Sequence, residues 1–325
     1  MFRTEFHIPR SKALIDLQDE IITMGSCFSD TIGSRLKDHK FRINPNPFGT
    51  VFNPVSLCRL IDTSLNSSEV SPDELIQNGE IFYHFDLHSD FSSTDPHELT
   101  VSINGQRENV RNGLVNSQWL ILTLGTAWVY EHKESDKLVS NCHKFPSEHF
   151  TKRLLSLEEI SNALEQTLGS LKSENPSLNL LLTLSPVRHS KDGMEANQVS
   201  KSILRLAIQE MVDLHEDVYY FPAYELLLDD LRDYRYYGRD LVHPSEEAID
   251  YIWGKFIHSF MEKESLEFIE RWKKIRAALE HKPFHPETKA HQDFLKKTLE
   301  DLHELSSWVD LGQEIDQLKK QIVDG

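Results

Sequence analysis

Continuous apolar runs alternate along the chain with segments whose apolar residues recur at helical spacing. The apolar runs, which predict strands, cover 21–23, 41–44, 119–125, 127–132, 178–184 and 218–221. The amphipathic segments, which predict helices, cover 28–36, 55–65, 94–116, 156–172, 197–214 and 244–260. Buried strands that alternate with such helices indicate a parallel sheet covered on both faces, so the pattern predicts an α/β fold.

The character of the sequence changes near residue 264. Beyond that point the apolar spacing predicts only helices, over 266–279, 294–309 and 315–322. We therefore expect an α/β domain over residues 1–262 and a helical extension over 263–325. The extension is expected to pack on the core or on a second subunit. Residues 67–78 are polar and read as a loop, and 81–93 read as an irregular excursion.

One stretch, Ile21 to Leu36, has the pattern of a nucleophile turn. Its β-branched residues 21–23 predict a buried strand, and Gly25-Ser26-Cys27 predicts a sharp turn into a helix. A small nucleophile at such a turn stands clear of the sheet, and the first free N–H groups of the helix favour a developing negative charge. Ser26 is the expected nucleophile. Cys27 is the alternative, although its position beside an apolar helix face favours packing.

A second candidate element lies more than two hundred residues away, at Asp240-Leu241-Val242-His243-Pro244. An aspartate and a histidine three residues apart, just before a helix, can be held on one turn. The carboxylate then orients the imidazole, and the other ring nitrogen is free to take a proton from a hydroxyl. With Ser26, the pair predicts a Ser-His-Asp triad. The alternative is a helix-capping serine and aspartate with a surface histidine.

Composition narrows the function classes. The 325 residues carry 35 basic and 52 acidic side chains, a formal net charge of −17, which argues against a nucleic-acid or polybasic membrane partner. Residues 1–12 lack the apolar run of a secretory signal, and no uncharged apolar run approaches the roughly 20 residues of a membrane helix. The three cysteines, an odd number at wide spacings, suggest a reducing compartment. We expect a cytoplasmic protein without cofactor or metal.

Several further stretches match one family. Residues 24–29, MGSCFS, closely resemble the signature of the GSCFA family, with Ser29 where the signature has alanine. That family belongs to the SGNH (GDSL-like) hydrolase superfamily. The resemblance continues, in order, through PNPFGTVFNP at 45–54, NCHKFP at 141–146, SPVRHSKDG at 185–193, YFPAYELL at 220–227 and DLVHPS at 240–245.

The resemblance implies a three-layer α/β/α, flavodoxin-like fold over roughly residues 1–262. It also implies Ser26 as nucleophile, Asp240 as orienting acid, His243 as base, and Gly49 as a backbone oxyanion donor. Members of the superfamily usually carry an asparagine after the third strand, where this chain has Gly125-Thr126-Ala127-Trp128. Thr126 and Asn53 are the candidates to replace that donor; a core hydroxyl and a helix cap are the alternatives.

The matching stretches also contain candidates for the lining of the pocket: His88, Cys142, His143 and Arg188. Arg188 follows a predicted strand and is suited either to an anionic substrate group or to a structural ion pair. The histidines lack the ligand spacing of a metal site. The aromatic run 233–237 reads either as a sugar-facing wall or as a packed surface turn.

These observations together predict a serine esterase that cleaves an acyl ester, with O-acetyl on a carbohydrate as the expected type. The expected partner is a small-molecule or glycan ester. Acyl transfer to an alcohol shares the first half-reaction and stays open, as does a non-catalytic binding module with the same fold. A further hypothesis makes the C-terminal helices an assembly device that joins identical chains.

Overall fold

A five-stranded parallel sheet forms the centre of the molecule. The computed structural model describes residues 5–322. From edge to edge the strands are β11 (Val218–Phe221), β10 (Asn179–Leu184), β6 (Trp119–Leu124), β1 (Glu20–Gly25) and β2 (Arg42–Pro45). Read from β2, this is the strand order 2-1-3-4-5 of flavodoxin-like folds. The predicted α/β fold class is confirmed.

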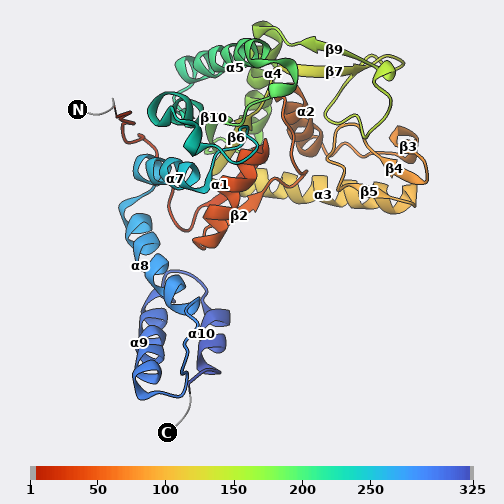
Figure 1. Cartoon of the computed structure of the whole chain (residues 1–325). Helices are drawn as coiled ribbons and strands as arrows, with labels where there is room; N and C mark the ends of the chain where they lie inside the picture. Colours follow the sequence, from red (N-terminus) through yellow and green to blue (C-terminus); the bar gives the residue numbers. More distant parts are fainter. Residues whose placement is uncertain (1–4, 323–325) are drawn as a thin grey trace.

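The two faces of the sheet are covered by different helices because successive strand residues point in opposite directions. Ile22 pairs in register with Leu120, which pairs with Leu180, and this face packs against four helices. They are α2 (Pro54–Leu65), α3 (Pro96–Asn116), α4 (Leu157–Glu174) and α5 (Met194–Leu214). Ile21 and Ile121 face the other side, where α1 (Cys27–Asp38) and α7 (Glu246–Phe260) lie. Figure 1 shows the resulting three layers.

Two small antiparallel sheets extend from the core beside α2 and α3 (Figure 1). One is ordered β3 (Ile76–Asn78), β4 (Ile81–Tyr83), β5 (Ser92–Ser93), and the other β8 (Lys137–Val139), β7 (Trp128–His132), β9 (Phe150–Leu154). The strand predicted over 127–132 is confirmed as β7. The irregular structure predicted for 81–93 is wrong where β4 and β5 form, because strands of two or three residues are too short to show a period.

The chain ends in helices α8 (Lys263–Leu279), α9 (Lys289–Leu305) and α10 (Gly312–Lys319). Figure 1 shows α8 leading away from the end of α7 to the α9–α10 pair. Phe268 and Trp272 of α8 are buried in the same apolar cluster as Phe28 of α1. Short helical turns cover Pro72–Glu74, Ser147–His149, Ser190–Asp192, Ala223–Glu225 (α6), Leu226–Leu231 and Tyr234–Tyr236. No helix among the described residues is long and apolar enough to span a membrane.

Candidate active site

Ser26 lies at the turn between strand β1 and helix α1, as the sequence predicts. Gly25 ends the strand with a φ of +141°, and a Cβ there would stand 2.2 Å from the carbonyl oxygen of Thr123. Only glycine tolerates this close approach of two strands. The next residue, Ser26, is the N-cap of α1 and is buried, with 1% of its surface exposed. The turn thus fixes the serine hydroxyl at the carboxyl edge of the sheet.

The first turn of α1 offers backbone donors beside Ser26. The N–H of Phe28 donates to Ser26 Oγ over 3.4 Å, and the N–H of Ser29 donates to the Ser26 carbonyl over 2.7 Å. Among the residues that the structure describes, the N–H of Cys27 donates to no backbone carbonyl, although it interacts with the Cys27 thiol itself. The Cys27 side chain is half-buried, and burial raises the pKa of its thiol. The Cys27 thiol is therefore poorly ionised, but the Cys27 backbone N–H lies at the positive end of a helix.

Asp240 and His243 form the predicted carboxylate–imidazole pair. His243 Nδ1 lies 2.6 Å from Asp240 Oδ2, and Asp240 Oδ1 accepts the N–H groups of Val242 and His243 over 2.9 and 3.0 Å. These hydrogen bonds, first the one from the imidazole, lower the pKa of the Asp240 carboxyl. The carboxylate is held ionised and fixes the ring so that Nε2 faces away from it.

Backbone contacts give the loop before α7 a defined shape. Gly238 N–H donates to the His243 carbonyl over 2.8 Å, and Ser245 N–H donates to the Tyr236 carbonyl over 2.8 Å. Leu241, which lies between Asp240 and His243 in the sequence, adopts a left-handed φ of 58°. This kink places the Asp240 carboxylate under the imidazole three residues later. The pair is local in sequence, which explains why its geometry was predictable.

Ser26 and His243 are not hydrogen-bonded in this structure. Ser26 Oγ contacts the N–H of Phe28, whereas the His243 side chain is half exposed, at 52% of its surface, and pairs with Asp240. Ser26 directly follows β1, and the loop of His243 is bonded through Val242 to Arg188, just after β10. Both therefore belong to the carboxyl edge of the sheet, where such sheets bind ligands. The Asp240–His243 pair and the serine turn are thus formed in this structure, whereas the hydrogen bond between His243 and Ser26 is not.

The residues expected to hold the oxyanion are mostly engaged elsewhere. Gly49 N–H donates to the Asn46 carbonyl over 2.7 Å in a turn. Asn53 caps α2, with its Oδ1 accepting the Ser56 N–H over 2.8 Å and its Nδ2 donating to Ser56 Oγ. Thr126 Oγ1 accepts the Trp128 N–H and shares a hydrogen bond of 3.1 Å with Ser200. In this conformation Asn53 has the capping role that its position before a helix also suggested.

The predicted pocket residues do not all lie together: His88 borders the Gly49 turn, whereas His143 lies among the small antiparallel sheets. His88 lies against the Gly49 turn, where a Cβ would meet the His88 Cβ at 2.5 Å. His143 is buried farther out, bonded through Nε2 to the His84 carbonyl and stacked on Tyr83 with ring centroids 4.6 Å apart. Burial raises the pKa of the Cys142 thiol to about 11. His143 therefore holds the antiparallel sheets together in this structure, while His88 borders the loop beside β1.

Arg188 joins the loop after β10 to the loop that carries His243. Its backbone N–H donates to the Val242 carbonyl over 3.3 Å. Its guanidinium carbon lies 4.0 Å from the centroid of the Tyr237 ring and 5.5 Å from that of Tyr234. A flat guanidinium stacked on an aromatic face is a favourable cation–π contact. The structure thus places Arg188 as a clamp on the 233–244 loop, and two rings of the aromatic run pack on it.

Two residues near the site were not predicted from the sequence. Lys201 of α5 is buried, with 1% exposure, and donates to the carbonyls of Gly125 and Ser185. Burial, reinforced by the Lys201 charge, lowers the pKa of His189 to about 4, so this imidazole is neutral. From the sequence alone, a lysine in an amphipathic helix is expected to face the solvent. The only signal for its burial would have been its place on the apolar face of 197–214.

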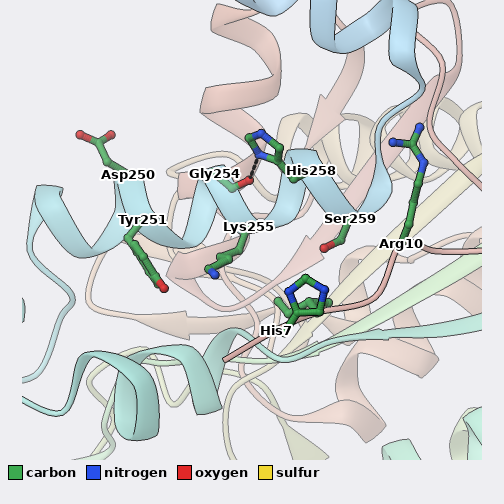
Figure 2. A pocket seen from close by; sticks show the side chains of 9 residues that line it. His7, Arg10, Asp250, Tyr251, Gly254, Lys255, His258 and Ser259 are labelled. Atoms are coloured by element: carbon green, nitrogen blue, oxygen red, sulfur yellow. Dashed lines mark hydrogen bonds between the residues drawn. The ribbon is translucent and has the colours of Figure 1, made fainter. Parts of the chain in front are cut away.

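A surface pocket of the molecule lies away from these residues. Figure 2 shows it between the N-terminal segment, with His7 and Arg10, and the outer face of α7, with Tyr251, Lys255 and His258. Neither Ser26 nor His243 lines it. The ring of His258 is turned back onto its own helix, where Nδ1 contacts the Gly254 carbonyl at 2.6 Å. The pocket has none of the nucleophile geometry of the strand edge.

The fold and the site define an α/β protein of the flavodoxin-like class with a serine turn and an aspartate–histidine pair at the carboxyl edge of its sheet. Residues 20–256 match the model of the GSCFA family, and residues 272–324 match the GSCFA domain protein, C-terminal domain. The chain belongs to the GSCFA family. No curated protein matches it.

Several solved structures resemble the chain distantly. A candidate platelet activating factor from Streptococcus pneumonia has 12% identity and a TM-score of 0.39, over 74% of this chain and 83% of that one. A Clostridium thermocellum family 3 carbohydrate esterase has 12% identity and a TM-score of 0.33, over 78% and 98%. A family 3 carbohydrate esterase from Talaromyces cellulolyticus has 10% identity and a TM-score of 0.30, over 79% and 99%. Similarity this distant assigns no activity to the chain.

Proposed function

We propose that the protein is a serine hydrolase that cleaves an acyl ester, of the O-acetyl carbohydrate type. His243 Nε2 takes the Ser26 proton, Ser26 Oγ bonds to the carbonyl carbon, and the carbonyl electron pair moves onto oxygen. The tetrahedral intermediate then collapses, the ester C–O bond breaks, and His243 returns the proton to the leaving alcohol. Water repeats these steps on the acyl-enzyme and releases the acid. An alcohol in place of water would make the same site an O-acyltransferase.

The Asp240–His243 contact carries this proposal. A carboxylate with two backbone N–H donors and a 2.6 Å bond to Nδ1 fixes the tautomer whose Nε2 accepts a proton. A surface histidine without a catalytic role would not require a carboxylate that two backbone N–H groups hold in place. The contact between Nε2 and Ser26 is proposed to form when substrate fills the site, because catalytic hydrogen bonds are often long in unliganded enzymes.

The N–H of Cys27, which donates to no backbone carbonyl within residues 5–322, is the proposed oxyanion donor. It lies one residue after the nucleophile and at the N-terminus of α1, where the helix dipole favours negative charge. Gly49 is proposed as the second donor; its N–H must first leave the Asn46 carbonyl that it contacts here. Substrate binding would then shift the 46–49 turn that packs on His88.

Labelling with a fluorophosphonate probe tests the nucleophile. We expect the full chain to be labelled at Ser26, found by peptide mapping, and Ser26→Ala to be unlabelled. The matched control is Ser29→Ala, which removes a buried hydroxyl of the same helix that has no partner among the described residues. Cys27→Ser should also keep the label at Ser26. Loss of labelling in Cys27→Ser but not in Ser26→Ala would assign the nucleophile to the thiol.

A non-catalytic binding module is the second candidate function. The open Ser26–His243 contact and the engaged oxyanion donors favour it. It predicts a folded wild-type chain that stays unlabelled at Ser26 and shows no burst with p-nitrophenyl acetate. Binding of an acetylated oligosaccharide, measured by calorimetry without release of acetate, would then support the binding module over the hydrolase.

We further propose that residues 263–325 form an extension through which two copies associate in the cytoplasm. Phe284, between α8 and α9, is 99% exposed, which suits a contact between two copies. Cys27, Cys58 and Cys142 form no disulfide, which suits a reducing compartment such as the cytoplasm. Light scattering should give the mass of a dimer for the wild type and of a monomer for Phe284→Ser. Val101→Ser, on the exposed side of α3, is the control. A wild-type monomer would contradict the proposal.

A further inference from the structure

Lys201 is a charged side chain in the interior of the α/β core. It is 1% exposed, and its Nζ donates to the Gly125 carbonyl over 2.8 Å and to the Ser185 carbonyl over 2.7 Å. The Tyr224 ring lies 5.5 Å away. Within residues 5–322 no carboxylate pairs with it in an ion pair. Two neutral carbonyls compensate a buried ammonium only in part, so a purely structural bridge would be costly.

Lys201 lies close to the proposed site, which suggests a function for the costly burial of its ammonium. Gly125 directly follows strand β6 and Ser185 directly follows β10, so the ammonium bridges the carboxyl ends of the two central strands. Ser26 N–H donates to Thr123 of the same β6 end. The Lys201 charge acts electrostatically on Cys27, the residue after Ser26, and on His189. The partly compensated cation therefore lies behind the serine turn.

We propose that the Lys201 ammonium is a positioning residue of the proposed ester site, holding the ends of β6 and β10 and stabilising the negative charge that develops beside Ser26. The proposal rests on the proposed function. A fixed cation in a water-poor interior acts on nearby charge far more strongly than one in solvent. It requires no contact between Lys201 and the substrate. Only its protonated form supplies the charge.

This role makes activity depend on the protonation of Lys201. The titratable groups that face it are Cys27 of α1, His189 of the loop after β10, and Tyr224 of α6. Burial raises the pKa of Cys27, lowers that of His189 to about 4 and raises that of Tyr224 to about 12. Burial lowers the pKa of Lys201 to about 7. Lys201 is thus the member of this group that changes charge near neutrality.

The test compares pH profiles of kcat/KM for p-nitrophenyl acetate between pH 5 and 9. We expect the wild type to lose activity on the alkaline side as Lys201 deprotonates. Lys201→Met should be about 10- to 100-fold slower at pH 6, with no alkaline fall. Lys201→Arg, whose charge persists at every pH, should keep activity at pH 9. A merely structural bridge would lower activity equally at all pH values and leave the profile unchanged.

Lys172→Met is the matched control. Lys172 also donates to two backbone carbonyls, of Pro176 and Leu178, but at the opposite, amino end of β10. It should keep the wild-type profile. A folded Lys201→Met with an unchanged profile would overturn the inference. If neither Lys201 variant folds, NMR titration of wild-type lysine side chains decides: a Cε signal titrating near pH 7 supports the inference, and its absence overturns it.

The serine-labelling experiment separates this inference from the proposed function. If the fluorophosphonate leaves Ser26 unlabelled in the wild type, the hydrolase proposal fails and the inference fails with it. If Ser26 is labelled and Lys201→Met keeps the wild-type profile, only the role of Lys201 fails. Labelling of Ser26 together with loss of the alkaline limb in Lys201→Met supports both.

Discussion

The indole N–H of Trp272 donates to the backbone carbonyl of Asp38 over 2.7 Å. Asp38 is the last residue of α1, the helix that begins beside Ser26, and its carbonyl has no partner within the helix. Trp272 belongs to α8 and is 3% exposed. The C-terminal helices therefore contact the end of α1 opposite the proposed nucleophile.

Replacing Trp272 should destabilise the whole chain. Trp272→Ala is expected to lower the free energy of unfolding by about 3–5 kcal/mol, because it leaves a cavity in the shared apolar cluster. Trp272→Phe should cost roughly 1–3 kcal/mol, because it leaves the Asp38 carbonyl without its donor. Urea unfolding followed by circular dichroism measures both. Leu214→Ala, at a 69% exposed position outside the proposed dimer contact, should change the value by less than about 0.5 kcal/mol.

Gly25→Ala should be among the most damaging small substitutions. The new methyl group would meet the Thr123 carbonyl oxygen at 2.2 Å, at a φ of +141° that alanine rarely adopts. We expect a loss of at least about 3 kcal/mol, or insoluble protein, because the strands β1 and β6 must separate. Gly169→Ala in α4 meets nothing within 4 Å and should stabilise by about 0.5–1 kcal/mol. Equal stability of the two variants would contradict the tight turn.

The central sheet was predictable because its signal is local. The run 119–124 is apolar at every position but Thr123 and is buried throughout, because both faces of the strand are covered, and its apolar character is visible in the sequence. The Asp240–His243 pair was predictable for the same reason, since its members are three residues apart. Strands of two or three residues, such as β5, carry no such signal, and their pairing depends on tertiary contacts.

The surroundings of Ser26 depend on contacts that no local pattern reveals. Thr126 is engaged by Ser200, 74 residues away, and Lys201 reaches carbonyls 76 and 16 residues away. Both contacts depend on which face of α5 packs against the carboxyl ends of the strands. The position of His243 likewise depends on the 233–245 loop, which Arg188 contacts through Val242 and Tyr237. The sequence therefore points to the groups that are proposed to react, but it does not reveal the residues around them.

Asp240→Asn should lower kcat/KM by about 100- to 10,000-fold without unfolding the protein. The amide cannot hold the imidazole in one tautomer or stabilise its charged form. The Asp240 side chain is 51% exposed, so its replacement leaves the core intact. Initial rates with p-nitrophenyl acetate and a thermal melt measure the two effects. Asp250→Asn, which removes an exposed carboxylate of α7, is the control and should keep full activity. Full activity in Asp240→Asn would exclude the triad.

Arg188→Met should loosen the loop that carries His243. The variant keeps the backbone bond to Val242 but loses the guanidinium stacked 4.0 Å from Tyr237. We expect a drop of about 10-fold in kcat and faster amide exchange over 233–244, because a cation–π contact contributes about 0.5–2 kcal/mol. Arg205→Met removes a similar stack, 4.2 Å from Tyr220, and should leave kcat unchanged. Equal effects of the two variants would contradict a specific clamp.

The pH dependence of stability provides a final test of the charge on Lys201. Burial lowers its pKa from 10.5 to about 7, so between these values the unfolded chain binds a proton that the native chain does not. Stability therefore rises with pH in this window, by at most about 1.4 kcal/mol per pH unit. The difference in unfolding free energy, wild type minus Lys201→Met, should increase from pH 7 to pH 10. A constant difference for Lys201→Met would mean that the buried amine keeps its proton throughout.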